Sequence, residues 1–288
     1  MSLNVLMGRF SELVQQRDAG VPLGSPWQAF CDAVNSYPIP AHLYQLWEQL
    51  EAFRGSRPRE TIAILDHGCG AGFSILYLFC RGYRKVFGVT YGFEEQPLWN
   101  RLFKEECGIY EKRLHTYTGE RLPIQSESID FIFSQQVLEH VRPQVLNSYF
   151  LEEVRVLRAG GRVFHEVPHR LGPYDSHSRI WLAHYFPWLV RRLLYRFVGL
   201  SSDIIARQEE RVHLRWPWQI KTSLRKHFRN VQDITLRSFL ESPSPERFDG
   251  PSGIRRLVQW GMQTPILGSV ARALLGKLVM LRLTADKK

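Results

Sequence analysis

The pattern of apolar and polar positions changes at Thr61. From there to Val167, short apolar runs alternate with longer segments in which apolar residues recur at helical spacing. The runs predict strands at Thr61–Asp66, Lys85–Thr90, Arg113–Thr118, Ile129–Ser134 and Gly161–Val167. The segments between them predict helices at Phe73–Arg81, Glu94–Cys107 and Pro143–Leu157. Strands and helices that alternate at short intervals are typical of a parallel sheet covered by helices, so we expect an α/β fold.

The residues on either side of this alternation have different patterns. Met1 to about Arg59 looks helical. After Pro168 the alternation is lost, and it returns only with a predicted helix at Trp218–His227 and a predicted strand at Asn230–Leu236. A turn rich in Pro, Ser and Gly at Ser242–Gly253 then precedes a basic, apolar region. We therefore predict a helical N-terminal cap at residues 1–59, a central domain at 60–240 with an insertion at about 169–216, and a basic, amphipathic helical C-terminal region at 241–288.

The composition suits one large domain with a full hydrophobic core, because the chain has 288 residues, of which 44% are apolar and 12% aromatic. No segment offers the ~18 uncharged apolar residues that a membrane-spanning helix needs, and the N-terminus does not resemble a signal peptide. The cysteines form no CxxC pair and no cluster with histidine at zinc spacing. We therefore expect reduced thiols, no metal site and a cytoplasmic protein.

The sequence ILDHGCGAGFS places a glycine-rich turn between a predicted strand and a predicted helix. Ligands of open parallel sheets bind at such a turn, and Gly68, Gly70 and Gly72 let the backbone approach a ligand closely. The spacing is GxGxG, and Phe73 stands where the dinucleotide fingerprint GxGxxG has its third glycine. Asp66 would repel a pyrophosphate but attract a sulfonium and an α-ammonium group. The turn therefore favours S-adenosylmethionine, and an NAD-dependent oxidoreductase is the weaker alternative.

Three segments, ILDHGCGAGFS, GERLPIQSESIDFIFSQQVLEHV and LEEVRVLRAGGRV, together resemble the class I S-adenosylmethionine-dependent methyltransferases. The likeness is closest to the broad family that includes ubiquinone-biosynthesis-type and many small-molecule methyltransferases, and it covers about Thr61 to Val167. It implies a Rossmann-like, doubly wound, mostly parallel sheet with helical additions at both ends. It also implies S-adenosyl-L-methionine as the cofactor and methyl transfer as the reaction.

The resemblance further implies which residues contact the cofactor. In that family the glycine-rich loop wraps the methionine end, and a later acid lies near the adenine amino group with a backbone amide beside it. Residues after the fourth strand face the methionine moiety and the acceptor. The matching residues here are Asp66, Gly68, Gly70, Gly72, Glu120, Arg121, Ser134, Gln135 and Gln136. For Glu120 and Gln135, a solvated loop is the alternative.

One position departs from the family's pattern. The second strand of that family commonly ends in an acid that binds both ribose hydroxyls, whereas here it ends at Thr90 and Tyr91. Glu94 or Glu95 in the next predicted helix could reach the ribose instead, or Thr90 could bond it more weakly. A further alternative is weak cofactor binding in a non-catalytic relative.

Methyl transfer to a hydroxyl requires removal of a proton, for which histidine is suited near neutral pH. His169 and His177 follow the fifth strand and are the preferred bases, while His140 serves either as a base or in packing a helix. Pro168–Pro187 resembles the corresponding segment of methyltransferases in bacterial glycan and lipid-linked sugar synthesis. We therefore predict O-methylation of a sugar or lipid-linked acceptor, with a quinone-like or other soluble small molecule as the alternative. The absence of NPPY and DPPY disfavours a nucleic-acid acceptor.

The formal net charge of +10 favours an anionic partner, or only keeps the protein soluble. Two segments concentrate basic residues among apolar ones: Trp181–Leu200, with Arg191, Arg192 and Arg196, and Ile254–Leu283. Basic, aromatic-rich helices that do not span a bilayer suit an anionic membrane surface, so a peripheral location at the inner face of the membrane is one prediction. The alternative is a lid that faces the core and leaves its arginines solvated.

Overall fold

The computed structural model describes residues 24–36, 38–91, 111–175, 180–197, 210–241 and 280–288, and the single residues 12, 15, 19, 199, 201 and 205. The predicted helix at Glu94–Cys107, including Glu94 and Glu95, lies outside the described residues, and so does His177. The chain divides into two compact units. Unit 1 comprises Met1–Phe133 and Arg155–Arg162, and unit 2 comprises Ser134–Val154 and Val163–Lys288.

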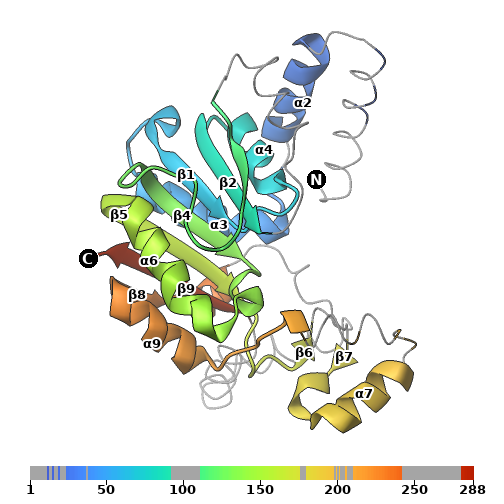
Figure 1. The fold of residues 1–288 in the computed structure, drawn as a ribbon. Helices are drawn as coiled ribbons and strands as arrows, with labels where there is room; N and C mark the ends of the chain where they lie inside the picture. Colours follow the sequence, from blue (N-terminus) through green and yellow to red (C-terminus); the bar gives the residue numbers. More distant parts are fainter. Residues whose placement is uncertain are drawn as a thin grey trace, which may run out of the picture. The chain divides into compact units, whose positions relative to one another are not determined.

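A seven-stranded sheet has the strand order β3-β2-β1-β4-β5-β9-β8 (Figure 1). Its strands are β1 (Ala63–His67), β2 (Lys85–Tyr91), β3 (Leu114–Tyr117), β4 (Ile129–Gln135), β5 (Leu157–Val167), β8 (Phe228–Asp233) and β9 (Leu281–Lys287). Strand β1 pairs in parallel with β2 and β4, and β2 pairs in parallel with β3, whereas β8 and β9 are antiparallel. The predicted α/β fold with a mostly parallel sheet is confirmed.

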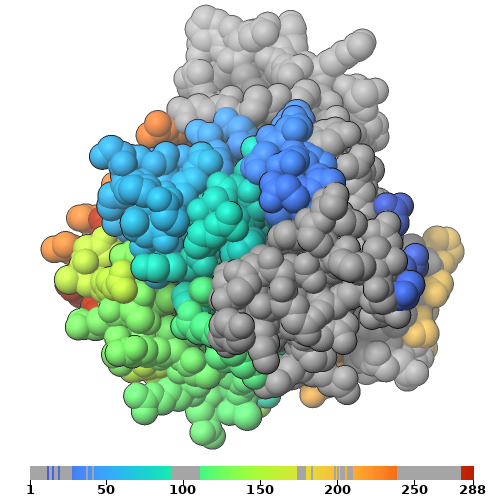
Figure 2. Space-filling view, turned by 90° about the horizontal axis from the view of Figure 1, so that it is seen from above, coloured from blue at the N-terminus to red at the C-terminus, as the bar shows by residue number. Residues whose placement is uncertain are grey.

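Unit 1 contains the helices that precede and cover its strands. Helices α2 (Gly24–Ser36) and α3 (Ala41–Arg54) are interrupted around Pro38 and Pro40, since proline removes a backbone donor and disrupts a continuing helix. Helix α4 (Phe73–Cys80) buries all but its first two residues. It contacts both α2 and β2, and Figure 2 shows blue and teal residues of this unit packed side by side. Helices thus occupy the described part of the N-terminal segment, while its role as a cap stays a prediction.

Unit 2 contributes most of the elements that follow β4. Its helices are η2 (Leu138–His140), η3 (Pro143–Val145), most of α6 (Leu146–Val156), η4 (Ala183–Tyr185), α7 (Trp188–Phe197), α9 (Pro217–His227) and α10 (Thr235–Glu241). Strands β6 (Tyr174–Asp175) and β7 (Ile180–Trp181) form a separate antiparallel pair. Phe150 and Phe228 are buried in the core of this unit, with ring centroids 6.3 Å apart. Among the described helices, none is long and apolar enough to cross a membrane.

The prediction of a helical C-terminal region is wrong for its last residues. Leu281–Lys287 form β9, which lies between β5 and β8 in the sheet. Every residue from Leu281 to Ala285 is buried, so this strand lacks the alternation of exposed and buried positions that marks a strand in a sequence. The buried guanidinium of Arg282 has partners within the protein. Its Nε donates to Glu166 Oε2 at 2.5 Å, and its Nη1 donates to Ser238 Oγ at 3.0 Å. Residues 242–279 lie outside the part of the chain that the structure describes.

The predicted strand at Asn230–Leu236 is displaced in the structure. Strand β8 begins at Phe228 and ends at Asp233, and α10 begins at Thr235. The Asp233 carboxylate accepts the backbone N–H of Thr235 at 3.0 Å. An aspartate that accepts a backbone N–H at this position is a typical start of a helix, and it overrides the apolar pattern that suggested a continuing strand.

Candidate functional site

The glycine-rich turn between β1 and α4 is built from backbone in the left-handed region. Gly68, Gly70 and Gly72 have φ values of 115°, 49° and 82°, which residues with a side chain rarely adopt. The backbone N–H groups of Gly68 and Cys69 both donate to Val89 O, each at 2.9 Å. The turn is therefore fixed against β2 by hydrogen bonds, and its three predicted glycines have positive φ values that favour glycine.

A fourth glycine in this region escaped the sequence analysis. Gly88 lies in β2 opposite Asp66 of β1. A Cβ atom added at Gly88 would be 2.2 Å from Ile75 Cδ1 and 2.8 Å from Cys69 Sγ, so only glycine lets the turn and α4 lie this close to the strand. A Cβ added at Gly70 would meet no protein atom within 4 Å. The turn therefore has a closed side toward β2 and an open side at Gly70. The signal in the sequence that could have identified Gly88 is a glycine inside a predicted strand, which often marks a close approach of another segment.

Asp66 is the acid of this site. The side chain lies in β1 and is only 4% exposed, and burial raises the pKa of its carboxyl to about 8. Removing a carboxylate from water disfavours its ionised form, and a neighbouring cation reverses that effect. The α-ammonium or sulfonium group of S-adenosylmethionine supplies such a cation, whereas a pyrophosphate would add negative charge. The open turn and the buried acid together fit S-adenosylmethionine.

Aromatic and hydroxyl groups occupy the carboxyl ends of β1, β2 and β3. His67 Nε2 lies 3.1 Å from Tyr117 Oη, and the ring of Tyr117 meets the ring of Tyr91 edge-on at 6.4 Å. Thr90 is buried, while Tyr91 is largely exposed. The sequence analysis missed His67 and Tyr117, which become neighbours only through the parallel pairing of the strands. Two further predicted residues, Glu120 and Arg121, are exposed.

In unit 2, the predicted cofactor residue Ser134 is fully buried at the end of β4. Its Oγ lies 2.7 Å from His165 Nδ1, and His165 Nε2 lies 3.3 Å from Glu153 Oε2. His165 belongs to β5 and Glu153 to α6, and neither is exposed. The hydroxyl of Ser134 is thus engaged inside the unit. Gln135 next to it is half-buried.

The predicted base His169 directly follows β5 and is only 3% exposed. Its Nδ1 accepts the backbone N–H of Leu171 at 3.2 Å, and Tyr185 Oη donates to Leu171 O at 2.7 Å. These contacts fold the chain back on itself after the strand and hold the imidazole in place. His140 has a different setting: it is exposed, and its Nδ1 lies 3.0 Å from Arg211 O, which favours the packing role for that residue.

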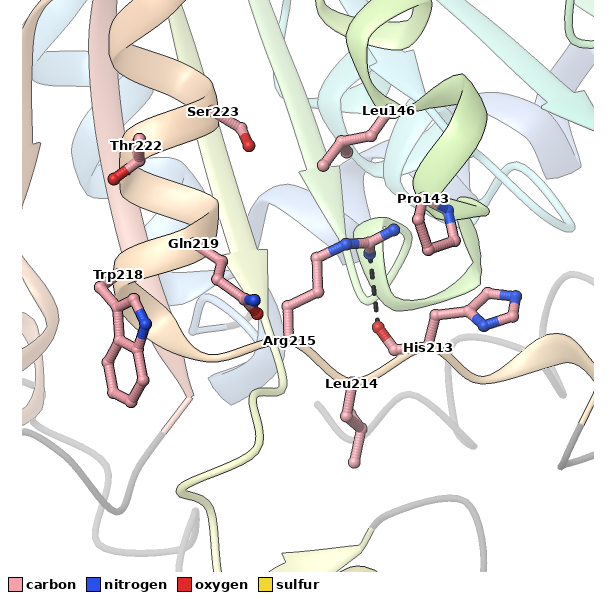
Figure 3. Close-up of a pocket in the computed structure, with 9 residues that line it drawn as sticks. All are labelled: Pro143, Leu146, His213, Leu214, Arg215, Trp218, Gln219, Thr222 and Ser223. Carbon is pink, nitrogen blue, oxygen red and sulfur yellow. Dashed lines mark hydrogen bonds between the residues drawn. The ribbon is translucent and has the colours of Figure 1, made fainter.

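A pocket of about 680 Å³ lies on unit 2 (Figure 3). Helix α9 supplies Trp218, Gln219, Thr222 and Ser223 to its wall. Gln219 points from α9 toward Arg215, which lies just before the helix, and Ser223 points toward Leu146 of α6, as Figure 3 shows.

The guanidinium of Arg215 is used inside the protein. It donates to Leu138 O at 2.5 Å and to His213 O at 3.4 Å, and it also donates to Val141 O. Gln219 Oε1 accepts the backbone N–H of Trp216 at 3.1 Å, so the pocket presents an indole ring, the amide nitrogen of Gln219 and two hydroxyls to a ligand, while Arg215 holds its wall together. Among the described residues, no group of three or more His, Cys, Asp or Glu side chains could hold a metal ion.

A family model described as a methyltransferase domain matches residues 65–165. The matched residues include the glycine turn, Asp66 and the residues at the end of β4. Residues 65–165 therefore form a class I S-adenosylmethionine-dependent methyltransferase domain. The predicted fold family, reaction and cofactor are thereby confirmed, while the roles of individual site residues stay predictions.

Comparison with other proteins places the methyltransferase among distant structural neighbours. No curated protein matches its sequence. The geranyl diphosphate C-methyltransferase from Streptomyces coelicolor A3(2) is 17% identical over 84% of this chain and 76% of its own, with a TM-score of 0.46. An S-adenosylmethionine-dependent methyltransferase from Mesorhizobium loti is 14% identical over 88% of this chain and 100% of its own, also with a TM-score of 0.46.

Proposed function

We propose that the methyltransferase transfers the methyl group to a hydroxyl of a sugar or lipid-linked acceptor. The observation that carries this proposal is His169, a buried imidazole fixed directly after β5. When bound, S-adenosylmethionine supplies a methyl group that its sulfonium activates. The protein has to orient the acceptor oxygen toward that methyl group and to accept its proton, because a neutral hydroxyl is a weak nucleophile.

The contacts of His169 define how it would take up that proton. Because Nδ1 accepts the N–H of Leu171, the neutral ring carries its own proton on Nε2. Protonation at Nδ1 therefore replaces the Leu171 contact. To act as the base, His169 has to release the Leu171 N–H from Nδ1.

The pocket on α9 supports the sugar part of the proposal. The ring of Trp218 stacks on that of Trp216, with centroids 4.9 Å apart and planes 10° apart, and Trp218 is more than half exposed. An indole face binds the C–H groups of a sugar ring, while the side chains of Gln219 and Thr222 can bond its hydroxyls. The Arg170 N–H, next to His169, donates to Arg215 O in the pocket wall at 2.9 Å. The base and the pocket therefore belong to connected segments of unit 2.

A quinone-like or other soluble small molecule is the second candidate acceptor. Such a flat, mostly apolar molecule would use the indole face but would gain little from the amide and hydroxyl groups of α9. The two candidates therefore differ in how strongly they depend on Gln219 and Thr222.

Transfer of labelled methyl groups from S-adenosylmethionine tests the proposal with three acceptor classes: free sugars, polyprenyl-phosphate-linked sugars and quinols. We expect base-stable methyl ethers on a sugar. His169→Gln should lower kcat by about 10²–10⁴-fold while S-adenosylhomocysteine binding is retained, because general base catalysis is worth that much. His140→Gln is the matched control, since that histidine is exposed. Equal kcat values for His169→Gln and the wild type would remove His169 from the reaction, and methylation of the quinol alone would replace the sugar.

A further inference from the structure

Helix α7 turns its most apolar side toward solvent. Leu189, Leu193 and Phe197 are 60%, 65% and 90% exposed. Because each is four residues from the next, they form one continuous stripe along the helix. Such a stripe normally faces the core of a soluble domain, and here it does not.

The opposite side of α7 carries its packing. Tyr195 is the buried residue of this helix at 3% exposure, and it forms a small cluster with Ile205 and Ile180. Arg191 and Arg192 are half-buried beside it. The helix is therefore attached through Tyr195, and the stripe of Leu189, Leu193 and Phe197 lies on its other side.

The exposed stripe continues into the residues that precede it. Together with the stripe, these neighbours form what we call the α7 patch. Its large apolar members are Trp181, Leu182, Tyr185, Phe186, Trp188, Leu189, Val190, Leu193 and Phe197, all of which are exposed. Contiguous apolar patches of this kind on a soluble protein mark a surface that something else covers.

The charged residues of helix α7 are all basic. Helix α7 contains Arg191, Arg192 and Arg196 and no acidic residue. Arg196 is exposed, and at seven residues from Leu189 it lies about two turns away on nearly the same side of the helix. The Arg192 guanidinium lies over the ring of Trp188, 5.3 Å from its centroid. Arginines therefore accompany the exposed apolar residues, as in helices that lie at a lipid headgroup layer.

We propose that the α7 patch binds the surface of an anionic phospholipid bilayer, with its apolar side chains inserted below the headgroups and Arg192 and Arg196 at the phosphate level. The charge favours this occupant over a second copy of the chain, because a twofold interface through α7 would bring together two helices that carry arginines and no acidic residue. The inference concerns a surface and not the acceptor, so it goes beyond the proposed function and does not depend on it.

Sedimentation of the full-length protein with vesicles tests this proposal. We expect binding to phosphatidylcholine vesicles that contain phosphatidylglycerol, weaker binding at high salt, and little binding to phosphatidylcholine alone. The double variant Arg192→Gln/Arg196→Gln should lose about 25-fold in affinity, or about fivefold for each arginine. Leu193→Ser/Phe197→Ser should lose about tenfold or more. The matched control is Leu151→Ser, because Leu151 is a half-exposed leucine on α6.

Three results would overturn the proposal. The first is a wild-type protein that stays in the supernatant with anionic vesicles at low salt. The second is unchanged binding by both double variants. The third is a dimer in solution that Leu193→Ser/Phe197→Ser converts to a monomer without vesicle binding. S-adenosylhomocysteine binding confirms that each variant is folded. Methyl transfer to a water-soluble acceptor without vesicles is measured in parallel, so that failure of membrane binding and failure of the proposed reaction are separate outcomes.

Discussion

The glycine turn after β1 and the segment after β5 both follow strands of one sheet, yet they are built in opposite ways. The turn is closed against β2 by hydrogen bonds to Val89 O and by the absence of a side chain at Gly88, and its acid Asp66 is buried. The segment after β5 holds most of the exposed large apolar side chains among the described residues. One region is closed by contacts within the chain, whereas the other leaves a large set of apolar side chains exposed.

The two regions also differ in the unfavourable free energy that each adds to the isolated folded protein. Burial raises the pKa of Asp66, so an ionised Asp66 is unfavourable until a cation joins it. The α7 patch leaves apolar area in water, which is unfavourable until it is covered. The first region is thus unfavourable because of a buried charge, and the second because of exposed apolar area.

The largest expected effect concerns the support of the segment after β5. Arg282→Met should destabilise the protein by about 3–5 kcal/mol, because it leaves the buried carboxylate of Glu166 without its partner near the end of β5. Urea unfolding measures this change. Arg229→Met on the neighbouring strand β8 is the control, since Arg229 is exposed and its loss should change stability by no more than about 0.5 kcal/mol. Equal effects of the two substitutions would show that the ion pair does not support β5.

A smaller effect is expected from the charge in the glycine turn. Asp66→Asn should weaken S-adenosylhomocysteine binding by about ten- to hundredfold, the equivalent of about 1.5–3 kcal/mol for one charged hydrogen bond. Because the pKa of Asp66 is raised to about 8, cation binding to the wild type releases a proton below that pH. Affinity measured by calorimetry should therefore increase as the pH rises from 6 to 8, by at most about tenfold per pH unit.

The same pKa predicts the opposite trend for the protein without cofactor. The folded state keeps the proton on Asp66 up to about pH 8, whereas the unfolded state releases it near pH 4, so stability should fall as the pH rises through this interval. Asp66→Asn should lack both this loss of stability and the increase in affinity. A wild-type affinity that stays flat between pH 6 and 8 would contradict the assignment of Asp66 to the cationic end of the cofactor.

The smallest expected effects come from adding a methyl group on either side of the glycine turn, at Gly88 on its closed side and at Gly70 on its open side. Gly88→Ala should destabilise the fold by about 1–3 kcal/mol, because its Cβ overlaps Ile75 and Cys69.

The added methyl group of Gly70→Ala meets no protein atom, so the substitution should destabilise the fold only by the strain of a left-handed backbone, about 1–2 kcal/mol. The methyl group does enter the space expected for the cofactor. We therefore expect Gly70→Ala to lose more binding than its stability explains. Thermal melts with and without S-adenosylhomocysteine measure both quantities. Normal cofactor binding by Gly70→Ala would place the cofactor elsewhere.

Local sequence was sufficient to predict the glycine turn and most strands. Glycines at positions that need positive φ, and an acid two residues before the first of them, produce the turn from short-range geometry alone. The contact between His67 and Tyr117 was missed because it depends on how β1, β2 and β3 pair. The contact of Ser134 Oγ with His165 Nδ1 was also missed, because it depends on β4 and β5 being neighbours in the sheet, while the role of Ser134 at the cofactor stays a prediction.

The sequence by itself determined the α/β alternation, the cofactor turn and the amphipathic character of α7, because these depend on residues within a few positions of one another. Only the tertiary structure decided that Leu281–Lys287 is a strand between β5 and β8 and that the apolar side of α7 faces outward. Periodicity shows that a helix has two unlike faces, but not which face the rest of the chain covers. A strand buried on both sides loses its alternation, so its place is set by distant partners such as Glu166.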